Sequence, residues 1–237
     1  MEKVVAFNIK SALGSFLRPQ SNNNPSTFHI IPKSAVVGII GAVIGLERDV
    51  MRDNNMYKFF TEKLKYSVIP RSNFQIKYWS EYSYIHGNVF QGGDIPIHTP
   101  RKSEKLVNIS YDIYIKYSDE DADVKSFLQN FTSNIKENSF VFPPYMGMAN
   151  FPADITYIGE YVPEIRNGKF TTNGICTTLD IDDMDKFRDI GIDDIPTQSI
   201  SYLAHHIYKT IYFHKNCGSL QAEGNYYAVN EEALEFI

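Results

Sequence analysis

The stretch ISYDIYIKYSDEDADVKSFLQNFTSNIK, residues 109–136, joins a strand pattern directly to a helix pattern. Its apolar side chains alternate from Ile109 to Tyr117, and this period of two predicts a strand. From Ser118 to Lys136 the apolar residues recur at helical spacing and form a stripe that one face of a helix would bury. Acidic residues precede this helix and Lys136 lies near its end, as the helix dipole favours. The chain is therefore predicted to have an α+β fold.

Similar patterns extend along the first 162 residues. They predict strands at Val4–Ile9, Phe74–Ile85 and Ile155–Val162, and helices at Ala35–Val50 and Met56–Leu64. Pro32 marks the start of the first helix, and Ser34 is a candidate cap. The run Phe74–Ile85 and the strand Ile109–Tyr117 are predicted to form a long hairpin with a basic limb. The resulting order suits a βαββαβ domain of the ferredoxin-like kind.

The last 75 residues carry weaker patterns. Glycines and the acidic stretch Asp180–Asp194 indicate loops and short strands, while Ser199–His214 fits a helix and a strand equally well. The run Asp180, Asp182, Asp183, Asp185 lacks the glycine and glutamate of a calcium loop. These carboxylates are therefore expected on a solvated face or against a basic partner.

Composition limits the class of protein. The 237 residues include 23 Lys and Arg against 28 Asp and Glu, giving a net charge of −5. Residues 1–118 hold 15 basic and 9 acidic residues, whereas residues 119–237 hold 8 and 19, so only the first half is net positive. The longest apolar run, Ala35–Leu46, is shorter than the roughly 20 residues of a membrane span. No membrane association is expected.

Cysteine and histidine spacing indicate neither a disulfide framework nor a zinc module. Cys176 and Cys217 are the only cysteines, and no second Cys or His pair follows at zinc-finger spacing. The start of the chain leads into a strand pattern and not into a signal peptide. We therefore expect a cytoplasmic protein without metal or cofactor.

Three glycines, Gly38, Gly41 and Gly45, fall on one face of the first predicted helix. Each costs about 1 kcal/mol relative to alanine in a helix interior, so something must approach that face closely. The underlying sheet is favoured, because close packing of a helix on a strand is a common use of glycine, and the backbone of a ligand is the alternative. The glycines do not form a phosphate loop, because no Gly-Lys-Ser/Thr follows them.

Basic residues in or beside the predicted loops of the first half are interleaved with aromatic residues. The basic set is Arg18, Lys33, Arg71, Arg101, Lys102 and Lys105, and the aromatic set is Phe16, Tyr78, Trp79 and Tyr82. Cations hold phosphates and aromatic rings stack on unpaired bases, which is the chemistry of single-stranded RNA binding. Ordinary surface charge over an aromatic core explains the same pattern equally well.

Three segments together resemble one known family. They are FNIKSALGSFLRP at 7–19, TFHIIPKSAVVGIIGAVIGLER at 27–48 and PPYMGMANFPADITYIGEY at 143–161. They resemble the signature blocks of the CRISPR-associated Cascade subunit that caps the 5′ handle of the CRISPR RNA. This subunit is a member of the RAMP superfamily, and the type I-B members are the most similar. The motifs are Phe16-Leu17-Arg18-Pro19, Pro32 with the three glycines, and Tyr145-Met146-Gly147.

The resemblance implies a domain plan and a set of partners. Residues 1–162 would form a ferredoxin-like RAMP domain with a β-hairpin thumb at about 70–107, and residues 163–237 a small, mostly β part. The thumb would fold over the RNA handle and contact the Cascade backbone subunit. The acidic second half would face the Cascade large subunit, and target DNA would be met indirectly, through the complex.

The resemblance also implies which residues bind the handle. They come from the loop after the first strand, the glycine-rich helix, the thumb base and the Tyr-Met-Gly motif: Phe16, Arg18, Asn22, Asn23, Asn24, Lys33, Ser34, Gly38, Arg101, Lys102, Lys105, Tyr145, Met146 and Gly147.

A non-catalytic role is expected first, since type I-B systems normally use a separate processing enzyme. The alternative is a metal-independent endoribonuclease that cuts precursor CRISPR RNA, as in the type I-C branch. Its general base would be His29 or a lysine of lowered pKa. A third hypothesis is a protein-only scaffold.

Overall fold

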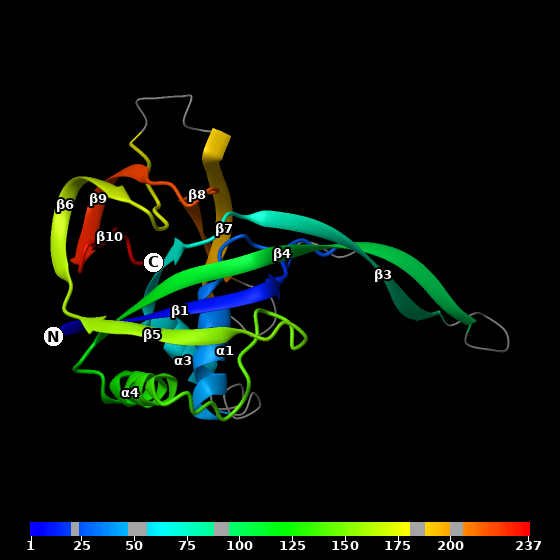
Figure 1. Ribbon diagram of the computed structural model, residues 1–237, viewed down its shortest axis with the longest axis horizontal. Coiled ribbons are helices and arrows are strands. Elements are labelled where there is room, and N and C mark those ends of the chain that lie inside the picture. The colour runs from blue at the N-terminus through cyan, green and yellow to red at the C-terminus, as the bar shows by residue number, and fades with distance from the viewer. Residues whose placement is uncertain (20–23, 47–55, 88–94, 181–187, 200–205) are drawn as a thin grey trace.

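The computed structural model describes residues 1–19, 24–46, 56–87, 95–180, 188–199 and 206–237 (Figure 1). Its helices are α1 (Lys33–Ile44), α3 (Met56–Lys63) and α4 (Ala122–Lys136). Its strands are β1 (Glu2–Gly14), β2 (Lys65–Pro70), β3 (Gln75–Gly87), β4 (Ile95–Ser118), β5 (Asp154–Tyr161), β6 (Glu164–Thr172), β7 (Ile190–Ser199), β8 (His206–His214), β9 (Leu220–Val229) and β10 (Glu232–Leu234).

An antiparallel sheet with the strand order β2-β4-β1-β5 forms the centre of the molecule. The inner half of β4 pairs with β1 on one side, from Glu2 opposite Ser118 to Gly14 opposite Leu106, and with β2 on the other. The three helices lie on one face of this sheet, and β6, β9 and β10 lie on the other (Figure 1). The chain is thus a sheet-rich mixture of helices and strands, as the sequence predicts.

The helix ends follow from local chemistry. Asp121 caps α4, because its side chain accepts the backbone N–H of Val124 at 3.3 Å. Helix α1 begins after Pro32 without a side-chain cap, so the prediction that Ser34 caps it is wrong. Gly45 ends α1 in the left-handed conformation at φ 81°, where glycine is favoured. The predicted stripe of three interior glycines is therefore reduced to Gly38 and Gly41.

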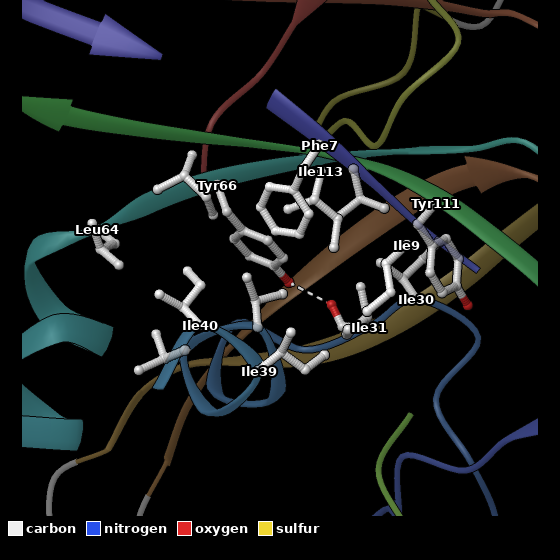
Figure 2. Close-up of a cluster of buried hydrophobic side chains, with 14 of the residues drawn as sticks. Phe7, Ile9, Ile30, Ile31, Ile39, Ile40, Leu64, Tyr66, Tyr111 and Ile113 are labelled. Carbon is white, nitrogen blue, oxygen red and sulfur yellow. Dashed lines mark hydrogen bonds between the residues drawn. The ribbon is translucent and has the colours of Figure 1, made fainter. Parts of the chain in front are cut away.

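Both faces of the central sheet are covered. On the helix side, Phe7, Ile9, Tyr111 and Ile113 pack against Ile39, Ile40 and neighbouring side chains (Figure 2). On the opposite side, Val4, Ala6 and Tyr114 pack against Val229, Leu234 and Phe236. The prediction that the first strand is buried on both faces is confirmed at residues 4–7.

The C-terminal part completes this core. Its strands form a sheet of order β10-β9-β6 and a ribbon of β7 with β8. The ribbon residues Ile195, Ile211 and Phe213 belong to the same hydrophobic cluster as the helix side of the central sheet. The backbone of Ile237 exchanges two hydrogen bonds with Tyr66 of β2, at 3.0 and 3.1 Å. Residues on either side of position 162 therefore share one core.

A long arm extends from the central sheet (Figure 1). It consists of β3 paired along its whole length with the outer part of β4, from Gln75 opposite Val107 to Gly87 opposite Ile95. The prediction that residues 74–85 pair with residues 109–117 is wrong, because β3 pairs with residues 95–107 and residues 109–117 pair with β1 and β2. Among the described residues, no helix is long and apolar enough to cross a membrane.

Candidate nucleic-acid interface

The loop between β1 and α1 folds back on itself. The backbone N–H of Arg18 donates to Ser26 at 2.9 Å, and that of Phe28 donates to Phe16 at 2.9 Å. Thr27 is buried between these segments, and its hydroxyl accepts the N–H of Phe16 at 2.8 Å. The segments that follow β1 and precede α1 therefore lie side by side.

Residues 24–27 of this loop are hydrogen-bonded to the base of the arm. The N–H of Glu104 in β4 donates to the carbonyl of Pro25 at 2.9 Å, and the Glu104 carboxylate accepts the N–H of Thr27 at 3.1 Å. Two residues further out, the N–H of Lys102 donates to the Asn24 side chain at 3.2 Å. Asn24 and Lys102, both exposed and both predicted to bind RNA, are thereby brought together.

The Tyr145-Met146-Gly147 motif lies against the start of the same loop. The carbonyl of Met146 accepts the N–H of Ser15 at 3.1 Å. Gly147 has φ 82°, and a Cβ on it would lie 2.0 Å from the Ser15 carbonyl oxygen, so only glycine fits. Met146 is fully buried, while Tyr145 is 43% exposed. Tyr145 is thus the member of the motif that presents a side chain to solvent.

Two further predicted binding residues at the arm base are buried. Phe16 belongs to the main hydrophobic cluster. Lys105 is nearly covered, with its ammonium 3.5 Å from the sulfur of Met148 and 5.7 Å from the ring centre of Phe151. These two side chains lie beneath the surface of the arm base. Exposed groups such as Lys102 and Tyr145 form that surface.

Arg18 is held by a carboxylate that the sequence analysis did not single out. Its guanidinium forms an ion pair with Asp193 of β7, and its Nε donates to the Thr27 carbonyl at 3.1 Å. It also lies over the ring of Phe28, with 4.9 Å between the guanidinium carbon and the ring centre. Asp193 is completely buried. Of the four aspartates predicted on a solvated face or against a basic partner, Asp180 is half-buried and pairs with Lys169 at 2.7 Å.

The alternation of residues 190–196 contains the signal for this burial. Gly191, Asp193 and Ile195 face inward, and Ile192 and Asp194 face solvent. A strand has this period of two, so an Asp in step with Gly and Ile belongs to the covered face. The run of acidic residues around it hides the pattern. Asp182, Asp183 and Asp185 lie outside the described residues.

The start of α1 carries a second group of predicted residues. Lys33 is buried above Tyr66, with 5.9 Å between its ammonium and the ring centre. Burial, together with the positive charges of Lys65 and Lys209, lowers the pKa of Lys33 to about 8. Gly38, one turn after the half-buried Ser34, has no atom within 4 Å of an added Cβ. Its lack of a side chain is therefore not required by packing against the sheet.

The predicted residues thus fall into two groups. Phe16, Asn24, Lys102, Lys105 and the Tyr145–Gly147 motif meet at the arm base, and Lys33, Ser34 and Gly38 lie at α1. Arg18 contacts Thr27, Phe28 and Asp193. Asn22 and Asn23 lie outside the described residues. The backbone of Arg101 is part of β4, and its side chain lies outside the described part.

Comparison with known proteins finds a likeness of fold without a likeness of sequence. No protein-family model and no curated protein matches the chain. The crystal structure of a CRISPR protein from Archaeoglobus fulgidus superposes with a TM-score of 0.58 at 9% identity, over 99% of this chain and 98% of that one. This chain shares its fold with that CRISPR protein.

Two more solved structures show weaker likenesses. A chain of a CRISPR RNA-guided surveillance complex has a TM-score of 0.49 at 10% identity, over 96% of this chain and 91% of that one. A structure described as a Cas protein has a TM-score of 0.46 at 12% identity, over 95% and 94%.

Proposed function

We propose that this chain is a non-catalytic subunit of a type I CRISPR surveillance complex and that it binds the 5′ handle of the CRISPR RNA. The fold shared with a CRISPR protein supports the defence role. The element order β1-α1-β2-β4-α4-β5 and the sheet order β2-β4-β1-β5 support a ferredoxin-like RAMP domain with β3 and outer β4 as its thumb. The three sequence blocks at 7–19, 27–48 and 143–161 support the assignment to the handle-binding subunit and the greater similarity to its type I-B members.

The observation that carries the proposal is the fastening of the β1–α1 loop to the arm base. Glu104 and Lys102 of β4 are hydrogen-bonded to Pro25, Thr27 and Asn24 of the loop. Segments that the family resemblance separately associates with the handle therefore adjoin one another. This junction combines a cation, an amide and the exposed ring of Tyr145, which are groups that hold phosphates and stack on splayed bases.

The arm extends the same chemistry outward. Tyr78 is 69% exposed and Trp79 44% exposed, on a strand that also carries the exposed Lys77. Exposed rings beside a cation suit stacking on unpaired bases. The arm would also contact the Cascade backbone subunit, and the acidic second half the large subunit, so that target DNA is met only through the assembled complex. The complex would act in the cytoplasm.

RNA binding by purified variants tests this proposal. The probe is labelled RNA of the CRISPR repeat from the same genome, with a scrambled RNA as control. We expect Lys102→Ala combined with Lys77→Ala, both exposed, to weaken binding and to reduce the dependence of affinity on salt by about one unit per lost phosphate contact. The matched control is Lys136→Ala on α4, because Lys136 forms an exposed ion pair with Glu160 of β5. Equal affinity of the double variant and wild type would exclude this surface.

One observation favours the endoribonuclease alternative. Because the pKa of Lys33 is lowered to about 8, a substantial fraction of its amine is neutral near that pH and can accept a proton from a 2′-hydroxyl. The test is incubation of the protein with repeat RNA in EDTA, followed by a denaturing gel. A single cut that grows faster toward pH 8 and is lost in Lys33→Met or His29→Ala would establish the enzyme. Intact RNA in a preparation that binds it would support the non-catalytic subunit.

A further inference from the structure

The buried carboxylate of Asp193 holds both ends of the β1–α1 loop. One oxygen, Oδ1, pairs with the guanidinium of Arg18 near the start of the loop and lies 3.4 Å from Nδ1 of His29. The other, Oδ2, accepts the backbone N–H groups of His29 at 2.7 Å and Ile30 at 3.2 Å, just before α1. Asp193 comes from β7, more than 160 positions away in the sequence.

The backbone of His29 is hydrogen-bonded through both its N–H and its carbonyl. Its N–H donates to Asp193, and its carbonyl accepts the hydroxyl of Tyr111 in β4. The imidazole packs against Phe74 and Phe213, with ring centres 5.8 and 5.5 Å apart. A fully buried carboxylate is tolerated only when donors surround it. The loop conformation that brings Arg18 beside His29 is therefore the one that Asp193 selects.

We propose that Asp193 is the positioning residue of the RNA-binding loop. By drawing Arg18 toward His29 and Ile30, it sets how the turn at Asn24 meets the arm base and where α1 begins. RNA binding thereby depends on the C-terminal ribbon being docked, although no ribbon residue needs to touch RNA. This inference rests on the proposed function, since it concerns the affinity of the same surface.

The physical effect is preorganisation. A loop that is already fixed in its binding conformation loses little further freedom when RNA binds, whereas a released loop must be ordered by the RNA itself. The substitution Asp193→Asn keeps the shape but replaces one acceptor oxygen with an NH₂ group that faces donors. We expect it to lower the affinity for repeat RNA by about tenfold in protein that remains folded.

The matched control is Asp194→Asn at the next position. Asp194 is exposed on the outer side of the ribbon, where it accepts the hydroxyl of Thr210 at 2.6 Å. This variant changes the same formal charge on the same strand without touching the loop. Its affinity for repeat RNA is expected to stay within twofold of wild type.

Hydrogen exchange separates positioning from general loss of stability. In Asp193→Asn, the amides of His29 and Ile30 should exchange at least tenfold faster, while amides of β1 and β4 in the central sheet keep their wild-type rates. Asp193→Glu retains both acceptor oxygens and the charge, so its affinity should lie between those of wild type and Asp193→Asn. If Asp193→Asn does not fold, the comparison of Asp193→Glu with wild type decides the question by the same two measurements.

Each outcome has a defined meaning. Lower RNA affinity together with local exchange at His29 and Ile30 supports the positioning role. Wild-type affinity in a folded Asp193→Asn variant overturns it and leaves the proposed function standing. Failure of the wild-type protein to bind repeat RNA overturns the proposed function itself, and the positioning role with it.

Discussion

At the scale of single residues, Arg18 illustrates how a candidate ligand becomes part of the framework. Its guanidinium is engaged by Asp193, by the Thr27 carbonyl and by the ring of Phe28. We expect Arg18→Met to lower the free energy of unfolding by about 2–4 kcal/mol, because it leaves a buried carboxylate without its cation. Chemical denaturation measures this loss.

The control for Arg18→Met is an arginine in an exposed pair. Arg166 lies 2.8 Å from Glu164, and both side chains are more than half exposed. Exposed ion pairs contribute about 0–1 kcal/mol, so Arg166→Met should change stability little. Equal losses in the two variants would contradict the structural role of Arg18.

Lys33 gives a prediction about pH. Its pKa is about 8 in the folded chain and 10.5 in the unfolded chain, so between these values the unfolded chain binds more protons. Stability contributed by this site therefore rises with pH across that window, and the cost of burying the cation is fully present below pH 8. We expect Lys33→Met to raise the free energy of unfolding by about 2 kcal/mol at pH 7. Denaturation at pH 7 and pH 10 should show this gain shrinking at the higher pH.

The residue-level chemistry of the site was only partly predictable. The sequence singled out Lys102 as a member of the basic set and Gly147 as part of the Tyr145-Met146-Gly147 motif. The partner of Arg18 is 175 positions away, so no local pattern connects them. Asp193 was predictable as a buried residue from its alternation with Gly191 and Ile195, but its neighbouring carboxylates pointed to solvent.

At the scale of elements, two glycines should respond oppositely to alanine. Gly38 lies within α1 and an added Cβ meets no atom within 4 Å, so Gly38→Ala should raise the free energy of unfolding by about 1 kcal/mol. Gly147 has positive φ and its Cβ would collide with the Ser15 carbonyl, so Gly147→Ala should lower it by about 2 kcal/mol or more. Thermal or urea denaturation of both variants gives the comparison.

Gly38→Ala also separates the two explanations of the glycine-rich helix. If the open face of α1 admits an RNA backbone, the stabilised variant should bind repeat RNA more weakly than wild type. Unchanged affinity would show that the RNA does not approach Gly38. A loss of stability would instead contradict the open space that the structure shows at this position.

The elements with a clear period were predictable, and those without one were not. Helix α4 and the inner part of β4 follow from their apolar spacing. Strand β2 was missed because all of Tyr66–Pro70 is buried, which removes the alternation that marks a strand. Strand β1 runs five residues beyond the predicted end at Ile9, because β4 supplies pairing partners as far as Gly14.

At the scale of the whole molecule, the two sequence-predicted parts depend on each other. Val4, Ala6 and Tyr114 are covered by Leu234 and Phe236, and the ribbon contributes Asp193 and Phe213 to the opposite side. A fragment of residues 1–162 would expose these apolar side chains and leave Arg18 without its carboxylate.

We therefore expect the fragment 1–162 to lack a cooperative thermal transition, whereas the full chain unfolds in one step. Calorimetry and near-ultraviolet circular dichroism measure this difference. The full chain carrying Arg166→Met controls for handling. A sharp transition in the fragment would show that residues 1–162 form an autonomous domain.

Strand β4 runs without interruption from the centre of the sheet into the arm. At about 3.3 Å per residue, its 24 residues extend over about 80 Å, and its inner end is hydrogen-bonded between β1 and β2. Asn108, where β4 passes from the sheet into the arm, has a φ of 52°, and the residues on either side of it stay paired with β1. A load on the outer half of β4 is therefore transmitted to the middle of the molecule through one residue of irregular backbone. A neighbouring protein that binds the arm would therefore also restrict the orientation of the whole subunit relative to itself.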